Sequence, residues 1–168
     1  MNVYKTKDSA IIPQYATQGS ACFDIHAAFD KGDKIIAYNS VNRKIEVLVK
    51  EIEGQPAFLI HPGQRVMIPT CLIFDIPENH VMKMYIRSSA AAKKGLTLSN
   101  GVGIIDSDYV DETHILVHNI SDSLTRVIHG ERLAQCMVEK MDQTQLIMIN
   151  ERPKQKTDRD GGIGSTGS

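Results

Sequence analysis

The chain has 168 residues, of which 42% are hydrophobic and 23% charged, so it has the composition of a globular protein and a length that predicts one domain. Nineteen Lys and Arg nearly balance twenty Asp and Glu, for a formal net charge of -1, which argues against stable nucleic-acid binding but permits a local anion site. The N-terminus lacks the apolar run of a signal peptide, and no stretch approaches the ~20 apolar residues of a membrane span, so we expect no membrane association.

Short β-type runs separated by turn residues dominate the sequence. Several runs alternate apolar and polar residues, as half-buried antiparallel strands do, and this pattern predicts an all-β domain with a barrel or jelly-roll arrangement. The predicted strands are KIEVLV (44–49), AFLI (57–60), RVMIPT (65–70), VMKMYI (81–86), THILVHNI (113–120), LAQCMVEK (133–140) and QLIMIN (145–150). The turn signals between them are EGQP (53–56), HPG (61–63), PEN (77–79) and HGE (129–131).

One short helix is predicted over SSAAAKKGL (88–96). Its alanines and lysines favour helix, and its glycine stands where a helix of about two turns would stop.

The last stretch, from Pro153, is polar, basic and rich in glycine, with one apolar residue, Ile163. Such a segment cannot bury enough apolar surface to fold alone, so it is expected to be a flexible tail. We therefore predict a β domain over 1–152 and a C-terminal tail over 153–168.

Five segments, in this order, resemble the five motifs of the trimeric dUTPase family. Together they span nearly the whole chain, and the third is long and distinctive. They are GSACFDIHA (19–27), RSSAAAKKGL (87–96), NGVGIIDSDY (100–109), GERLAQ (130–135) and DRDGGIGSTG (158–167).

The resemblance implies a jelly-roll-like, distorted β-barrel with one short helix. It implies a homotrimer whose active sites are each assembled from three chains, with a tail that closes the site. The implied reaction is hydrolysis of dUTP to dUMP and pyrophosphate, which keeps uracil out of DNA and supplies dUMP for thymidylate synthesis.

Asp106 resembles the catalytic carboxylate of this family. Hydrolysis at the α-phosphate requires a positioned water and a group that accepts its proton, and a carboxylate on a rigid hairpin supplies both. In isolation Asp106 and Asp108 would be assigned to a turn, because Asp favours turns. The apolar pair Ile104–Ile105 is expected to fix the hairpin beside Asp106, and Asp108 is expected to be structural.

The segment from Asn100 to Tyr109 is expected to form a β-hairpin that receives the nucleoside. By resemblance, the amide of Asn100 faces the uracil edge, and Tyr109 packs on the deoxyribose and excludes a 2′-hydroxyl. Gly103 permits close approach of the backbone to the base.

Arg87 and Ser88 resemble the phosphate-binding pair of the second motif. The Ser88 hydroxyl would donate to the oxygen that bridges the α- and β-phosphates, where charge develops as pyrophosphate leaves. Taken alone, Ser88 would be interpreted as a helix N-cap. Ser89 belongs to the same motif, and Gln135 resembles the phosphate-contacting amide of the fourth.

Mg²⁺ is the implied cofactor, held mainly by the triphosphate oxygens, with Asp24 acting on it indirectly through water. In the tail, Arg159 resembles an arginine finger. Ile163 stands where the family usually has a Phe that stacks on uracil, and it would cover the base by dispersion. Backbone and hydroxyl donors would surround the triphosphate. The residues expected to supply these donors are Gly161, Gly162, Gly164, Ser165 and Thr166, which surround Ile163 in the sequence.

The sequence departs from the family at several places. Cys22 replaces the usual Gly of the first motif, and Val110–Asp111 replace the usual Arg–Gly after the Tyr. The region from about 29 to 60 is longer than usual, and KIEVLV and AFLI around EGQP are predicted to form an inserted hairpin there.

Two alternative functions stay open on the sequence alone. A dCTP deaminase shares the fold and an RSS segment, although the IDSDY segment and the glycine-rich tail favour dUTP hydrolysis. A nucleotide-gated regulatory module would use the inserted hairpin as its interaction surface.

Two other kinds of site are not supported by the sequence. His114 and His118 form an HxxxH pattern, but on a strand their side chains start ~13 Å apart and cannot share a metal. The three cysteines form no CxxC pair, and free thiols fit a reducing cytoplasm, that of a bacterium or a phage-infected host included.

Overall fold

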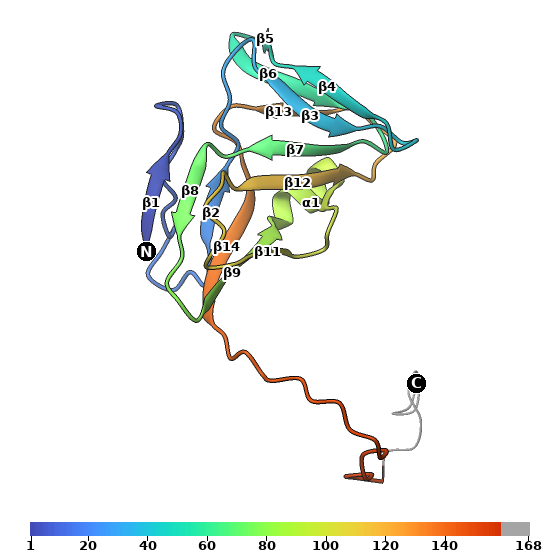
Figure 1. Cartoon of the computed structure of the whole chain (residues 1–168). Helices are drawn as coiled ribbons and strands as arrows, with labels where there is room; N and C mark the ends of the chain where they lie inside the picture. The colour runs from blue at the N-terminus through green and yellow to red at the C-terminus, as the bar shows by residue number, and fades with distance from the viewer. Residues whose placement is uncertain (159–168) are drawn as a thin grey trace.

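The computed structural model describes residues 1–158, and within this range the chain is built from β-strands and one short helix (Figure 1). The predicted all-β class is therefore confirmed. The strands are β1 (Asn2–Lys5), β2 (Phe23–His26), β3 (Lys34–Tyr38), β4 (Lys44–Leu48), β5 (Lys50–Ile52), β6 (Gln55–Ile60), β7 (Arg65–Pro69), β8 (Leu72–Asp75), β9 (His80–Ile86), β10 (Leu96–Leu98), β11 (Gly103–Ile105), β12 (His114–Asn119), β13 (Thr125–Ile128) and β14 (Arg132–Lys140).

The strands of the described part pair in an antiparallel manner into separate sheets and do not close into one barrel. The largest sheet has the order β10-β12-β7-β3-β4. A second sheet, β11-β9-β14-β2, carries Asp24, Gly103 and Gln135 on its strands, and Arg87 and Asp106 directly follow two of them. Two smaller sheets, β1-β8 and β13-β6-β5, complete the body.

The period-two pattern of the strands places their apolar side chains in one core. In β12, for example, Ile115 and Val117 are fully buried and alternate with partly exposed neighbours. They pair with Ile68 and Val66 of β7, which are also fully buried. Register is therefore fixed by burial, because a shift of one residue would turn these side chains to solvent.

Helix α1 (Ser88–Lys94) confirms the predicted helix. Gly95 ends it in the left-handed conformation, with φ of 61°, and a Cβ at this position would lie 2.6 Å from the Cβ of Ser121. Arg87 is the N-cap and makes no side-chain cap bond, so Ser88 is the first helical residue and its interpretation as an N-cap is wrong.

The C-terminal end of α1 is tied to the turn before β14. Lys94 forms an ion pair with Glu131 and donates a hydrogen bond to the carbonyl of Arg126 at 2.7 Å. This contact joins the segment 87–96 to the segment 130–135 within one chain.

The region from 29 to 60 contains two hairpins where the sequence predicted one. The strand predicted over 44–49 pairs with β3, and the turn at Glu53–Gly54 joins β5 to β6. β4 and β5 are separate strands because Val49 lies between them, is buried and donates its N–H to the carbonyl of Asp33 at 2.8 Å. The chain therefore bends between β4 and β5.

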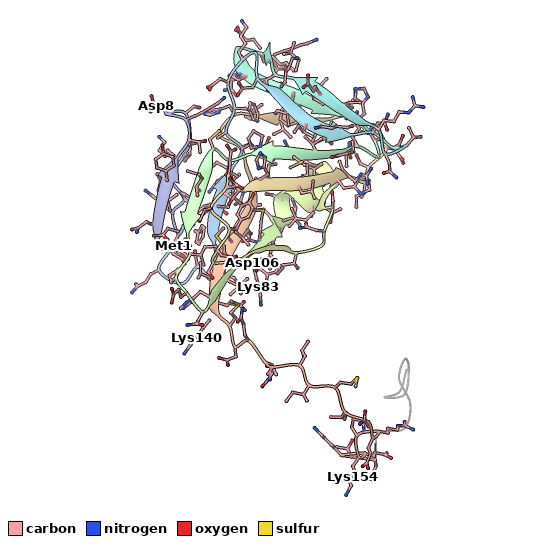
Figure 2. The ribbon with its side chains drawn as sticks, in the orientation of Figure 1. Met1, Asp8, Lys83, Asp106, Lys140 and Lys154 are labelled. Carbon is pink, nitrogen blue, oxygen red and sulfur yellow. The ribbon has the colours of Figure 1, made fainter. Side chains whose placement is uncertain are left out.

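The strand predicted over 145–150 is not formed: in residues 1–158, β14 is the last strand. The chain leaves the body after Lys140 as an extended segment that reaches Lys154 (Figure 2). Its apolar side chains are exposed, with Leu146 at 94% and Met148 at 88%. The predicted pattern is present, but a strand needs a partner edge, and the segment has none in a single chain.

No helix in the described part of the chain is long and apolar enough to span a bilayer. Seven residues of the predicted site lie outside the described residues. They are Arg159, Gly161, Gly162, Ile163, Gly164, Ser165 and Thr166.

Phe29 connects the 29–60 region to the main core, and we expect it to be important for stability. Its ring is fully buried, 5.2 Å from the ring of Phe58 and 6.0 Å from that of His129. Phe29→Ala should lower the free energy of unfolding by roughly 3–5 kcal/mol through lost burial and a cavity. Urea unfolding followed by circular dichroism, at one protein concentration, measures this change.

Val41→Ala is the matched control, because Val41 is 67% exposed in the same region. Its effect should stay within about 0.5 kcal/mol. Equal effects of the two substitutions would show that the 29–60 region does not share the core.

Candidate active site

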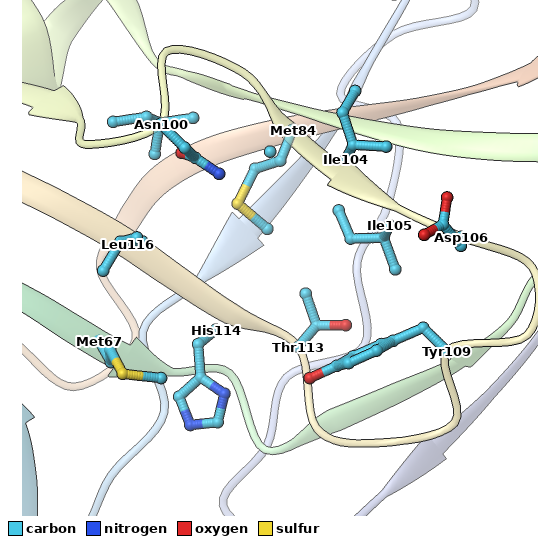
Figure 3. A pocket seen from close by; sticks show the side chains of 12 residues that line it. Met67, Met84, Asn100, Ile104, Ile105, Asp106, Tyr109, Thr113, His114 and Leu116 are labelled. Carbon is cyan, nitrogen blue, oxygen red and sulfur yellow. The ribbon is translucent and has the colours of Figure 1, made fainter.

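A pocket between the two larger sheets contains four of the residues predicted to form the nucleoside site. Asn100, Gly103, Asp106 and Tyr109 line it together with side chains from β7, β9 and β12 (Figure 3). Its volume of about 290 Å³ lies at the lower end of small-molecule sites, which run from roughly 300 to 1,000 Å³. The structure thus places these four residues around one cavity.

The expected hairpin from Asn100 to Tyr109 is not a ladder of two paired strands. β10 pairs with β12, whereas β11 pairs with β9 in the other sheet. The segment therefore crosses from one sheet to the other, and the pocket lies at the crossing. Gly103 permits this, because a Cβ there would lie 3.0 Å from the Cβ of Met84.

Asp106 follows the last residue of β11 and is exposed at the rim of the pocket. The preceding Ile105 is 8% exposed and anchors the strand in the core, while Ile104 faces outward and is 56% exposed. Anchoring therefore comes from Ile105 rather than from the pair. The carbonyl of Asp106 accepts a hydrogen bond from the N–H of Tyr109 at 3.2 Å, which closes a tight turn.

Two pocket residues were missed by sequence reasoning. Thr113 is 3% exposed, and its buried hydroxyl makes no hydrogen bond with any residue that the structure describes. His114, considered in the sequence only as a metal ligand, lines the same pocket. Nothing in the sequence distinguishes Thr113 or His114 from ordinary strand residues, because both lie within the alternating apolar and polar pattern predicted for 113–120.

A second group of predicted residues surrounds the carboxylate of Asp24. Its Oδ1 forms an ion pair with Nε of Arg87 at 2.8 Å, and its Oδ2 accepts a hydrogen bond from Nη1 of Arg132 at 3.0 Å. The Asp24 side chain is only 14% exposed, so solvent screens these pairs weakly. Gln135 lies opposite Asp24 in the β14–β2 register. Two guanidinium groups against one carboxylate leave a local positive charge suited to an anion.

Arg132 is the member of this group that sequence reasoning did not single out, although it lies inside the segment GERLAQ. Beside it, burial holds the pKa of His26 below its usual range, and the neighbouring guanidinium groups of Arg132 and Arg87 lower it further, against the opposing effect of Asp24. His26 therefore favours its neutral form, and the positive charge at this place comes from the arginines.

The two groups do not meet within one chain. Ile105 pairs with Met82 near the start of β9, and one more step in this register would put Asp106 level with Val81. Arg87 directly follows the other end of the same strand. Six residue steps lead from Val81 to Arg87, about 20 Å at ~3.3 Å per step. Ser88 and Ser89 directly follow Arg87 and open helix α1.

No group of three or more His, Cys, Asp or Glu side chains in residues 1–158 is arranged to hold a metal ion. Each oxygen of Asp24 already faces one arginine, Oδ1 in an ion pair with Arg87 and Oδ2 in a hydrogen bond from Arg132. A carboxylate oxygen has two lone pairs, so Asp24 retains the capacity to accept from a metal-bound water.

Comparison with known proteins shows what this chain is similar to. A family model described as dUTPase matches residues 51–167. Deoxyuridine 5′-triphosphate nucleotidohydrolase of Bdellovibrio bacteriovorus is 34% identical over 157 residues, which cover 93% of this chain and 87% of that protein. The enzyme of the same name from Rhizobium leguminosarum bv. trifolii is 33% identical, with 93% and 85% covered.

Solved structures show a similar fold. Staphylococcus bacteriophage 80alpha dUTPase with dUPNHPP has a TM-score of 0.74 at 20% identity, covering 99% of this chain and 98% of that chain. Streptococcus mutans dUTPase has a TM-score of 0.61 at 22% identity, covering 84% and 93%. The matched family model and the identities to these relatives lead to one conclusion: the chain belongs to the dUTPase family.

Proposed function

We propose that this chain hydrolyses dUTP to dUMP and pyrophosphate, with Asp106 as the group that accepts the proton of the attacking water. The observation that carries the assignment of residues is the pocket lined by Asn100, Gly103, Asp106 and Tyr109. In a member of the dUTPase family, this pocket has the residue types needed to hold a deoxynucleoside beside a carboxylate. Nothing in the geometry favours dCTP deamination or a purely regulatory role.

The proposed mechanism begins with the base in the pocket. The Asn100 amide presents a donor and an acceptor to the uracil edge, which a cytosine edge would not match. Tyr109 packs against the deoxyribose, so a 2′-hydroxyl is excluded by contact. Asp106 orients a water in line with the α-phosphorus and takes its proton as pyrophosphate leaves.

The phosphate side is proposed to come from another copy of the chain. Arg87, Arg132 and Gln135 lie around Asp24, and we call these four residues the arginine-rich group. Ser88 and Ser89 directly follow Arg87, which lies about 20 Å from Asp106 in one chain. A triphosphate bound there cannot place its α-phosphorus at the Asp106 of that same chain. A homotrimer with sites shared between subunits brings the two groups together.

The extended segment after Lys140 supports this assembly. Leu146, Ile147, Met148 and Ile149 are each at least 62% exposed, which is unfavourable for an apolar run in water. A neighbouring subunit can cover these side chains and offer a strand edge. The tail that follows, from Arg159 to Thr166, is proposed to close over the triphosphate of a neighbouring site.

Mg²⁺ is proposed to enter with the triphosphate, because Mg²⁺ keeps its waters and prefers phosphate oxygens with few carboxylates. Asp24 has the remaining lone pairs to accept from one of those waters. When bound, the ion neutralises charge on the phosphates. The free thiols favour action in a reducing cytoplasm.

Asp106→Asn should lower kcat by about 10²–10⁴-fold, because the amide cannot take a proton. The dissociation constant for an α,β-imido analogue of dUTP should change little. Pyrophosphate release and calorimetric titration measure the two quantities. Asp108→Asn removes the same charge two positions away and should retain turnover. Normal turnover in the Asp106 variant would reject its role as base.

Mixed assemblies test the shared site. Asp106→Asn and Arg87→Ala chains, each weakly active alone, should regain activity when they are unfolded together and refolded as a mixture. Random assembly of equal amounts should restore about a quarter of the wild-type sites, because each site needs an intact residue from two different subunits. Separately refolded variants that are then combined serve as the control. Absence of recovery in co-refolded samples that form trimers would place both residues in one subunit's site.

A further inference from the structure

The loop that carries Asp106 and Tyr109 has little regular structure of its own. It runs from 106 to 113 between β11 and β12, and we call it the catalytic loop. Tyr109 is 42% exposed and Val110 is 72% exposed, so the core does not hold the middle of the loop. Asp106 and Tyr109 nevertheless lie at the same end of the pocket (Figure 3). Something near the end of the loop must fix its position.

Glu112 makes the contacts that can do this. Its Oε1 accepts a hydrogen bond from the N–H of Cys71 at 3.0 Å, and its Oε2 accepts from the hydroxyl of Thr6 at 3.2 Å. The next residue continues the attachment, because the N–H of Thr113 donates to the carbonyl of Leu72 at 2.9 Å. The loop end is thus bound to the segment after β1 and to the bend between β7 and β8.

The backbone of Glu112 connects this anchor to the nucleoside pocket. Its carbonyl accepts a hydrogen bond from the hydroxyl of Tyr109 at 3.0 Å. Nδ1 of His114 lies 3.0 Å from the same carbonyl, and because a carbonyl can only accept, this nitrogen is the donor. Nε2 of His114 lies 3.8 Å from Oε1 of Glu112. The Tyr109 ring is therefore held at its hydroxyl end by a residue whose side chain is fixed elsewhere.

Cys71, the partner of the Glu112 carboxylate, has an unusual backbone conformation. Its φ is 54°, in the left-handed region that disfavours residues with a Cβ, and its side chain is 3% exposed. Such a conformation persists only where the surroundings determine it, and it occurs often near functional sites. Here it directs the N–H of Cys71 at the carboxylate, while the thiol donates to the carbonyl of Ala28 at 3.2 Å.

We infer that Glu112 is a positioning residue of the active site, which holds the Tyr109 ring through its own anchored backbone and thereby sets discrimination between deoxyribose and ribose. This inference rests on the proposed function. Glu112 does not touch the reacting atoms and acts through Tyr109 and the catalytic loop. Without its carboxylate anchor the loop end loses two hydrogen bonds, and the Tyr109 ring can move to admit a 2′-hydroxyl.

The test is the ratio of kcat/KM for dUTP to kcat/KM for UTP. A substitution that only destabilises the protein lowers the active fraction equally for both substrates and leaves the ratio unchanged. Glu112→Ala should lower the ratio by about tenfold or more, because displacement of a positioning group by ~1 Å can cost 10²-fold in rate. Glu112→Gln keeps an oxygen that accepts from Cys71 and should restore most of the ratio. Asp111→Ala removes a neighbouring exposed carboxylate and should leave the ratio as in wild type.

Tyr109→Phe keeps the ring and removes only its hydrogen bond to Glu112, so it too should lower the ratio. If Glu112→Ala does not fold, the ratio measured for Tyr109→Phe tests the inference in its place. A wild-type ratio in Glu112→Ala, or in Tyr109→Phe where the first variant is insoluble, would overturn the inference while dUTP hydrolysis by wild type stands. A wild-type chain that does not hydrolyse dUTP would reject the proposed function and the inference together.

Discussion

The antiparallel pairing of β9 with both β11 and β14 determines where the chemical groups of this protein lie. β11 approaches β9 closely because Gly103 has no side chain to meet Met84, and this approach sets Asp106 beside the first half of β9. β14 pairs along the whole of β9 and brings Gln135 beside its second half, where Arg87 follows. The length of this one strand thus separates the proposed proton acceptor from the proposed phosphate contacts, and this separation is why we propose a site shared between chains.

The two halves of the proposed site are held by different kinds of interaction. The arginine-rich half is a charged group in which Asp24 fixes two guanidinium groups at 2.8 and 3.0 Å and is itself shielded from water. The nucleoside half depends on backbone geometry: a glycine that allows two strands to approach, a turn closed by Tyr109, and a loop end bound through Glu112. Strands position both halves, while Tyr109 lies in an exposed loop and the segment after Lys140 leaves its apolar side chains exposed.

Much of the fold follows from local pattern. Alternation of apolar and polar residues correctly indicated strands at 65–70, 81–86, 113–120 and 133–140, because burial on one face needs only a period of two. The pattern failed at 145–150, where the residues are suited to a strand but a single chain offers no edge. It also failed to show that the strand at 44–49 pairs with β3, because alternation does not specify a partner.

The sequence by itself determined the all-β class, the short helix with its glycine stop, the resemblance to dUTPases and four of the residues that line the pocket, because these depend on local composition and on motifs of fixed spacing. Tertiary structure alone decided which other residues hold the site residues in place. The contacts of Glu112 with Cys71 and Thr6, and of Arg132 with Asp24, join positions 41 to 108 residues apart. They arise from strand register and from a left-handed residue at 71, which are properties of packing between distant segments rather than of any segment alone.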